Sequence, residues 1–420
     1  MNIKQIYAYE IFDSRGLPTI ECAVELENGV KVYASTPSGA SVGSSEALEL
    51  RDHDTKRLQG KGVLQAINYI NQIIAKKFIN QPINALAMDA LLIDLDQHPQ
   101  KTTIGANTTL AMSMALFKAQ AASQGLELYE LIQQVSGTLQ ATMPTPLFNV
   151  INGGAHANNN LRVQEYMIIP RKPITQENHQ SDVYIDALHA GIEFYQHLKK
   201  HLDGIGQSTN VGDEGGFAPN LESDKSALDL LQDVAQELTE HTYDFALDIA
   251  ASELYNPKLK TYDLVQEKNL SAQDLVNIYA TWCKSYPIIS IEDGMADTDV
   301  DGWKILTSQL GQNIQLVGDD LFVTSPMKIR KGIMQKTGNA VIIKPNQIGT
   351  VSQTLAAIDV CKNNNLNIVV SHRSGETNDT FICDLAVGTA CQYIKAGAPA
   401  RGERIAKYNR LLDINRILHG

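Results

Sequence analysis

Six short apolar runs in the second half of the chain each stop at a charged or hydrogen-bonding residue. In chain order, the runs lead to Asp248, Glu292, Asp319, Lys344, the group His372, Arg373 and Ser374, and finally Lys395. Such runs are typical of buried strands, and a parallel barrel places the carboxyl ends of its strands around one mouth. The pattern therefore predicts a barrel whose mouth holds three carboxylates followed by a series of cations.

Two earlier runs complete the expected set of strands. PLFNVING and RVQEYMIIP precede Asp248 and raise the expected strands to eight, the number that closes a barrel of this kind. From Asp248 onward, the runs alternate with amphipathic stretches at spacings that suit βα units. The predicted fold class is α/β, with a (β/α)8 barrel as its larger part.

The first third of the chain predicts a smaller α+β domain. Its expected strands, which helical stretches follow, are residues 3–12, 19–26 and 30–35. Asn28-Gly29 between the second and third is a strong hairpin signal. Residues 37–47 form a Gly/Ser-rich stretch, and alone they are most simply interpreted as a flexible surface loop. Turn formers and prolines near 135–146 predict a boundary, so we expect domains at 1–135 and 136–420.

Composition narrows the class of protein and its compartment. The 420-residue chain has a net charge of −12, which argues against general nucleic-acid or anionic-membrane binding because phosphate attraction needs a basic surface. Its five cysteines form no CxxC pair, so neither a disulfide framework nor a zinc site is indicated. The sequence has no signal-peptide pattern and no apolar run long enough to span a membrane. We therefore expect a cytoplasmic protein.

The three carboxylates of the series predict a metal site. Asp248, Glu292 and Asp319 would repel one another strongly if they met without a cation between them. All three offer hard oxygen ligands, which favour Mg²⁺ or Mn²⁺ over Zn²⁺. A single acidic residue at a strand end is more often a helix cap or a surface charge, but three in series favour the metal.

The cations that follow predict an anionic substrate. Lys344, Arg373 and Lys395 would offset the charge of a ligand that carries both a carboxylate and a phosphate. An arginine holds phosphate with two parallel hydrogen bonds, and Ser374 could add a donor beside Arg373. The alternative for any one of these cations is a solvated charge at the barrel mouth.

Two further motifs precede the series. His156 lies in a Gly/Asn-rich loop, and Gln164 and Glu165 open the strand that follows it. Glu214 lies in GDEGG, where flanking glycines suggest a tight turn or a close approach to a ligand. An ordinary exposed turn is the alternative for GDEGG. No dinucleotide fingerprint, P-loop or GxSxG motif is present.

Long motifs along the whole chain resemble the enolase (phosphopyruvate hydratase) family in its bacterial form. They are DSRGLPT, PSGASVGSSEALELRD, NVINGGAHANNN, QEYMIIP, NVGDEGGFAPNL, SIEDG, VGDDLFVT, IIKPNQIGT, VSHRSGETNDTFICDLAVG and IKAGAPARGER. The resemblance implies a modified TIM barrel with an antiparallel second strand, preceded by an α+β domain. It also implies a glycolytic hydro-lyase that reversibly dehydrates 2-phosphoglycerate to phosphoenolpyruvate with two Mg²⁺ ions.

The resemblance also implies a role for each site residue. Lys344 resembles the base that removes the C2 proton, and Glu214 resembles the acid that protonates the leaving hydroxyl, with Glu165 beside it. We expect neighbouring cations to lower the pKa of Lys344. The implied metal ligands are Asp248, Glu292, Asp319 and, in the Gly/Ser loop, Ser41. The implied substrate-binding residues are His156, Gln164, Glu165, His372, Arg373, Ser374 and Lys395.

The resemblance leaves partners and alternatives to be tested. It implies a homodimer or an assembly of dimers. Val42 stands where the family usually has threonine, which bears on closure of the Gly/Ser loop. One alternative is a relative that acts on a phosphonate analogue of the substrate. Another is a structural or partner-binding role, at the cell surface or with nucleic-acid machinery.

Overall fold

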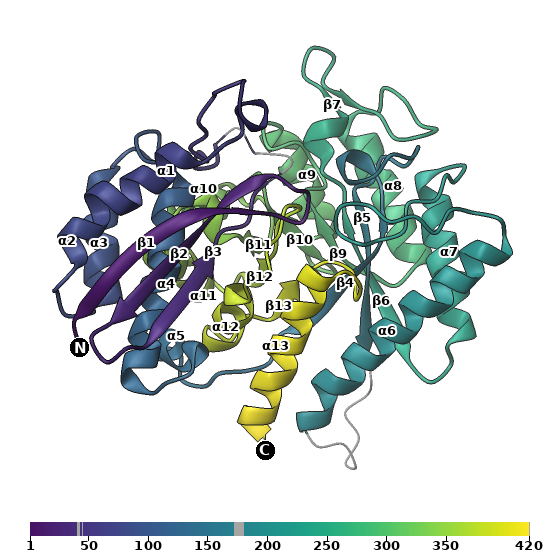
Figure 1. Cartoon of the computed structure of the whole chain (residues 1–420). Helices are drawn as coiled ribbons and strands as arrows, with labels where there is room; N and C mark the ends of the chain where they lie inside the picture. The colour runs from purple at the N-terminus through teal and green to yellow at the C-terminus, as the bar shows by residue number, and fades with distance from the viewer. Residues whose placement is uncertain (40–42, 44, 172–179, 420) are drawn as a thin grey trace.

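The structure is a computed structural model that describes residues 1–39, 43, 45–171 and 180–419 (Figure 1). Its two parts are a three-stranded sheet near the N-terminus and a closed eight-stranded barrel. Ser41 and Val42 lie outside the described residues, so the expectations for them stay predictions. No helix in the described part of the chain is both long and apolar enough to cross a membrane.

The N-terminal part is an antiparallel sheet packed against helices. Strands β1 (Ile3–Phe12), β2 (Pro18–Leu26) and β3 (Lys31–Ser35) agree with the expected strands to within one residue. Gly29 has φ 87° in the turn before β3, a conformation that glycine adopts without strain. The other elements of this part are η1 (Leu58–Gly60), α1 (Leu64–Asn68), η2 (Tyr69–Ile74), α2 (Ala75–Phe78), α3 (Ala85–Leu95), α4 (Ala106–Gln124) and α5 (Leu128–Ser136).

Helix α4 joins the two parts of the molecule. It packs against β2 and β3 on one side and against η5 (Pro345–Gln347) and α11 (Val351–Asn363) of the barrel on another. Every residue from Ala106 to Phe117 is buried, including the polar Asn107, Thr108, Thr109 and Ser113, so the two parts of the molecule enclose this stretch of the helix. The small domain is thereby fixed beside the barrel (Figure 1).

The barrel contains all eight strands expected from the apolar runs. Around the barrel their order is β10-β11-β12-β13-β4-β5-β6-β9, and the sheet closes on itself. Apolar side chains from these strands, such as Leu147, Ile342 and Val369, form a small cluster distinct from the main core. The strands are β4 (Thr145–Asn152), β5 (Glu165–Arg171), β6 (Thr242–Asp248), β9 (Ile288–Glu292), β10 (Gln315–Gly318), β11 (Ala340–Ile343), β12 (Asn367–Ser371) and β13 (Tyr393–Lys395).

Strand β5 runs antiparallel to both of its neighbours, β4 and β6, whereas the other neighbouring pairs in the barrel are parallel. The register pairs Glu165, the first residue of β5, with Asp248, the last residue of β6. Asp248 in turn pairs with Glu292 at the end of β9. The reversed strand expected from the family resemblance is confirmed, and it delivers Glu165 to the same end of the barrel as the other strand ends.

Helices surround the barrel and connect its strands (Figure 1). Two of them, α6 and α7, follow β5 before the chain enters β6. Side chains of Ser223, Ser271, Ser325 and Thr350 cap the first turns of α7, α8, α10 and α11. The remaining elements are η3 (Gly154–His156), α6 (Gln180–Gly204), α7 (Asp224–Glu237), η4 (Ala251–Leu254), β7 (Tyr255–Asn256), β8 (Thr261–Tyr262), α8 (Ala272–Ser285), α9 (Val300–Leu310), α10 (Pro326–Gln335), α12 (Phe381–Gly388) and α13 (Gly402–His419).

Candidate active site

The strand ends and two loops converge on one polar cavity. Its lining includes eleven of the residues expected from the sequence, together with Ser371. The lining residues are His156, Gln164, Glu165, Glu214, Asp248, Asp319, Lys344, Ser371, His372, Arg373, Ser374 and Lys395. Glu292 lies next to this set, in contact with Lys395. The structure therefore brings together every expected site residue within the described part of the chain.

Lys395 lies between three buried carboxylates. Its Nζ atom is 2.9 Å from Asp248 Oδ2, 2.9 Å from Glu292 Oε2 and 3.0 Å from Glu165 Oε1. Burial disfavours the ammonium, but the three carboxylates outweigh burial and raise the pKa of Lys395 well above its usual range. Lys395 is thus a fixed cation, and its contacts explain how these acidic side chains lie close together.

Lys344 makes a similar contact with the third expected metal ligand, Asp319. Their side chains form a short ion pair in the cavity. Gln347 donates its side-chain N–H to the other oxygen of Asp319 at 2.8 Å. Burial favours neutral lysine, but Asp319 outweighs burial and raises the pKa of Lys344. The neighbouring cations Arg373 and Lys395 do act to lower this pKa, as expected, but the direct contact with Asp319 makes the net shift upward.

The oxygen donors fit a hard divalent cation. Burial and then the neighbouring Asp248 raise the pKa of Glu292 to about 8, and Glu292 Oε1 is buried without a hydrogen-bond partner among the described residues. A buried oxygen of this kind is costly unless a proton or a cation satisfies it. The donors come from three neighbouring strand ends, β6, β9 and β10, and Mg²⁺ prefers such carboxylate oxygens.

A second acidic group shares Asp319. Oxygens of Asp293, Asp319 and Asp320 lie within 4.8 Å of one another. Asp293 already accepts the backbone N–H groups of Asp319 and Asp320, both at 2.9 Å. These bonds fix the turn that follows β10, so Asp293 acts as a support for Asp319.

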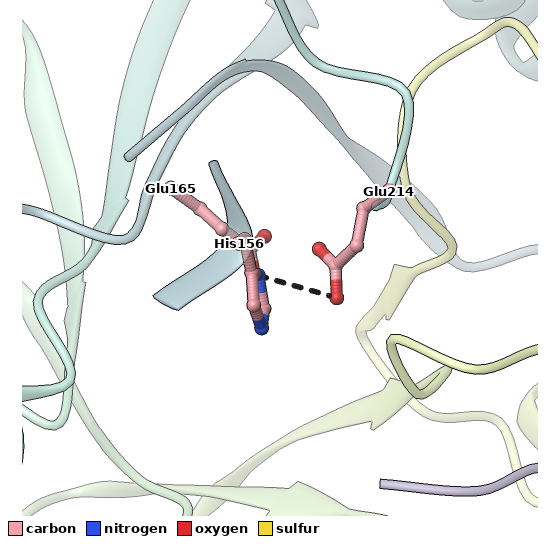
Figure 2. Close-up of side chains that lie close together, drawn as sticks. All are labelled: His156, Glu165 and Glu214. Atoms are coloured by element: carbon pink, nitrogen blue, oxygen red, sulfur yellow. Dashed lines mark ion pairs between the residues drawn. The ribbon is translucent and has the colours of Figure 1, made fainter. Parts of the chain in front are cut away.

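His156, Glu165 and Glu214 form a compact group on another side of the cavity (Figure 2). His156 Nδ1 is 3.5 Å from Glu214 Oε1 and 3.7 Å from Glu165 Oε1. Burial, followed by the charge of Glu214, raises the pKa of Glu165 well above its usual range. Burial acts in the same direction on Glu214, but His156 and His372 outweigh it and hold the pKa of Glu214 well below its usual range. The pKa values of the two carboxylates are thus shifted in opposite directions, so Glu165 is the more readily protonated of the pair.

Arg373 and Ser374 lie at the end of β12, where a phosphate was expected. Arg373 is buried and donates to Glu46 Oε2 at 2.8 Å and to Asn346 Oδ1 at 3.1 Å. Ser374 Oγ is 3.0 Å from His156 Nε2. The guanidinium is thus already paired with a carboxylate of the protein, and an incoming anion would compete with Glu46 for it.

Several supporting residues were missed by sequence reasoning. Glu46 lies at the end of the Gly/Ser stretch and also accepts a hydrogen bond from Gln347 at 3.2 Å. Gln347 follows Lys344 in KPNQ, a motif that signalled only the lysine. Arg404 is buried beside His372. Asp293 stands directly after Glu292. Asp293 and Gln347 could have been found only because they lie next to predicted site residues in the sequence. No feature of the neighbouring sequence indicated Glu46 or Arg404.

The mouth of this barrel holds buried carboxylates, lysines and an arginine. Such a site is typical of enzymes that bind a metal cation together with an anionic small molecule. A family model described as the enolase C-terminal TIM barrel domain matches residues 140–419, and the enolase N-terminal domain model matches residues 3–132. The chain belongs to the enolase family. The family is one of Mg²⁺-dependent lyases that act on small molecules, and its domains support hydro-lyase activity of the enolase type.

Proposed function

We propose that the protein catalyses the reversible dehydration of 2-phosphoglycerate to phosphoenolpyruvate. The observation that carries this proposal is the single cavity that combines Lys344, the neighbouring carboxylates Glu165 and Glu214, and the buried guanidinium of Arg373. The reaction needs one group to remove a proton, one to protonate a leaving hydroxyl and one to hold phosphate. We assign these tasks to different sides of the same cavity.

Substrate binding is assigned to the cations and to polar groups near them. Arg373 would bind the phosphate with two parallel hydrogen bonds, in competition with Glu46. Ser374 and His156 would add polar contacts beside it, as would His372. Lys395 would bind the substrate carboxylate. The amide of Gln164 lies 3.3 Å from Asp248 Oδ2 and would orient that carboxylate.

Metal binding is assigned to Asp248, Glu292 and Asp319, with Ser41 proposed for a second ion. Bound Mg²⁺ would stabilise the extra negative charge that develops on the substrate carboxylate when the C2 proton leaves. A lysine or histidine base combined with Mg²⁺ is general to the enolase superfamily, and this chain offers the same combination as a member of it.

Lys344 is proposed as the base, and it must first lose its own proton. The ion pair with Asp319 favours charged Lys344. Any interaction that moves Asp319 away from Lys344 makes the charged form of the lysine less favourable. The nearby guanidinium of Arg373 then favours the neutral amine. Lys344 thus depends on Asp319 for its protonation state as well as for its position.

Glu214 is proposed as the acid that protonates the leaving hydroxyl. Hydroxide is a poor leaving group, so the acid must carry a proton. Burial and the charge of Glu214 favour the protonated form of Glu165, whose oxygen lies within 4.8 Å of a Glu214 oxygen. We infer that Glu165 stores the proton and that Glu214 delivers it, with Asn149 steadying Glu214 by a hydrogen bond of 3.1 Å.

Two variants separate the two proton-transfer steps. With excess Mg²⁺, Lys344→Ala should lose both turnover and exchange of the C2 proton with deuterium in the solvent. Glu214→Gln should lose turnover by a factor of about 10²–10⁴, as general acids typically contribute, but should keep C2 exchange. Ultraviolet absorbance of the product and proton NMR measure the two quantities. Exchange in Lys344→Ala excludes Lys344 as the base, and absence of turnover in wild type overturns the assignment.

We also propose a glycolytic role in the cytoplasm and a homodimer or an assembly of dimers. A strong preference for a phosphonate analogue over 2-phosphoglycerate would replace the proposed substrate. Light scattering on the purified protein measures the assembly, and a mass equal to one chain would contradict it.

A further inference from the structure

Arg404, in the first turn of α13, has no exposure to solvent and holds several parts of the site together. One terminal nitrogen donates to His372 Nδ1 at 2.6 Å and to the carbonyl oxygen of Arg373 at 2.7 Å. The other donates to the carbonyl oxygens of Ser374 at 2.7 Å and Asp213 at 3.1 Å. One guanidinium therefore connects the end of β12 with the loop that carries the proposed acid.

The surroundings of Arg404 differ from those of an ordinary structural ion pair. Glu403 Oε1 lies 3.4 Å from Nε, whereas carbonyl groups and one imidazole take the terminal nitrogens. Gly397 has φ 86°, and a Cβ atom there would lie 2.8 Å from Arg404 Cδ. A larger residue at position 397 would therefore collide with the aliphatic part of the Arg404 side chain. The backbone is shaped around a guanidinium that binds the loops of the site.

The contact with His372 determines where that imidazole carries its proton. Guanidinium N–H groups are donors and have no acceptor, and arginine stays charged in proteins. His372 Nδ1 must therefore accept the hydrogen bond, so the ring is neutral and its proton is on Nε2. Burial first, and the charge of Arg404 among other causes, lower the pKa of His372 to about 3. The neutral ring is the consistent state.

The protonated Nε2 of His372 faces the proposed acid. It lies 3.5 Å from Glu214 Oε2 and makes no hydrogen bond to the described residues, so Nε2–H lies beside a carboxylate oxygen that it can bind after a small shift. If the proton were on Nδ1 instead, the Nε2 lone pair would face that oxygen and repel it. The carbonyl of Asp213, which precedes Glu214, is bound by the same guanidinium. Arg404 thus acts on Glu214 through two routes, one through the imidazole and one through the backbone.

We propose that Arg404 is a positioning residue that fixes the Nε2–H tautomer of His372 and thereby orients Glu214 for proton delivery. Its effect on turnover rests on the proposed function of the site. The tautomer itself is a property of the free protein and stands independently of any substrate.

The tautomer is measured in wild-type protein by NMR of ¹⁵N-labelled histidine, with a His372→Gln variant to assign the signal. We expect His372 to be neutral and protonated on Nε2 throughout pH 6–8. A ring protonated on Nδ1, or a doubly protonated ring, overturns the proposal. This result does not depend on whether 2-phosphoglycerate is the substrate, so it separates failure of the inference from failure of the proposed function.

Variants test the consequence for turnover. Arg404→Ala should lower kcat on the order of 10- to 100-fold, the usual effect of removing a group that orients a site residue, with a smaller change in KM. Added guanidinium ion at low, non-denaturing concentration should restore part of kcat, whereas ammonium should not. Equal rescue by both ions, or an unchanged kcat, contradicts the positioning role. If the variant does not fold, the wild-type spectrum still decides the tautomer.

Arg410 provides a matched control on the same helix. It contacts Asp384 and Glu127, and its removal eliminates a partly buried guanidinium outside the set of residues that line the cavity. Arg410→Ala should lose stability without changing the His372 signal, and its kcat should not respond to guanidinium. A changed tautomer in Arg410→Ala would show that general loosening of α13, rather than the contact of Arg404, controls the ring.

Discussion

Replacing Lys395 by methionine tests how charge is balanced inside the barrel mouth. The variant keeps most of the apolar stem and removes the ammonium that contacts Asp248, Glu292 and Glu165. Breaking a buried ion pair by removing one partner typically costs about 3–5 kcal/mol. Burial and Asp248 already raise the pKa of Glu292 to about 8, so proton uptake relieves part of the repulsion. We expect a loss near the lower limit, about 3 kcal/mol, in chelator at pH 7.

A divalent cation held by the same carboxylates would replace the missing positive charge. In wild type the cation must compete with Lys395, whereas in Lys395→Met it need not. A ligand present at 100 times its Kd stabilises the folded state by about 2.7 kcal/mol. Wild type gains in the same way, so the deficit of Lys395→Met shrinks by RT times the logarithm of the ratio of the two Kd values. We expect Mg²⁺ to bind about 100-fold more tightly once Lys395 no longer competes, which brings the deficit to about 1 kcal/mol or less in saturating Mg²⁺.

Urea unfolding followed by circular dichroism, in excess chelator and in excess Mg²⁺, measures both quantities. Lys407→Met is the matched control, because its buried ammonium lies 2.8 Å from Glu376 Oε2 and also binds the carbonyl of Thr377. Its deficit should be equal in the two solutions. The reasoning is refuted if Lys395→Met has the same deficit in Mg²⁺ as in chelator, or if its deficit in chelator is below about 1 kcal/mol.

Two further predictions concern buried carboxylates outside the cavity. Asp224 accepts hydrogen bonds from the backbone N–H groups of Arg162, Val163 and Val265 at 2.8, 3.1 and 3.0 Å. Asp224→Ala should therefore lower the free energy of unfolding in urea by about 4 kcal/mol. A loss below about 1 kcal/mol would contradict this and mean that water replaces the carboxylate. Burial raises the pKa of Asp89 from 3.8 to about 6. Between pH 3.8 and about 6, the folded protein therefore keeps a proton on Asp89 that the unfolded chain has already lost. The contribution of Asp89 to the free energy of unfolding is greatest below about pH 4. It decreases by about 3 kcal/mol as the pH rises through about 6. Asp89→Asn should remove this slope from a plot of unfolding free energy against pH, and an unchanged slope contradicts the argument.

The strand-end residues were predictable because buried strands have a recognisable sequence pattern. A strand covered on both faces is an apolar run, and the first polar residue after it marks its end. Asp248, Glu292, Lys344 and Lys395 were located in this way, and β6, β9, β11 and β13 end at or one residue before them. The number of strands and the barrel followed from the same pattern.

The direction of β5 was not predictable from local pattern. Apolar runs are the same when read in either direction, so only the family resemblance indicated that Glu165 begins its strand at the active end. The contacts of Arg404 were also hidden. An arginine in the first turn of a polar helix normally lies in solvent, and only the folded arrangement places its guanidinium against His372. The charged state of Lys344 depended on a contact with Asp319 that spacing along the chain does not encode.

The reversal of β5 has a topological consequence for the chemistry. A chain that crosses the barrel in the opposite direction arrives at the far end, and it needs an even number of further crossings before the next strand can begin there. The pair α6 and α7 supplies them. The active end therefore receives a strand-to-strand connection, residues 153–164, and a helix-to-helix connection, residues 205–223, where an all-parallel barrel would have strand-to-helix connections. His156 lies in the first and Glu214 in the second. One inverted strand thus gives this barrel the two unusual loops from which the proposed leaving-group chemistry is built.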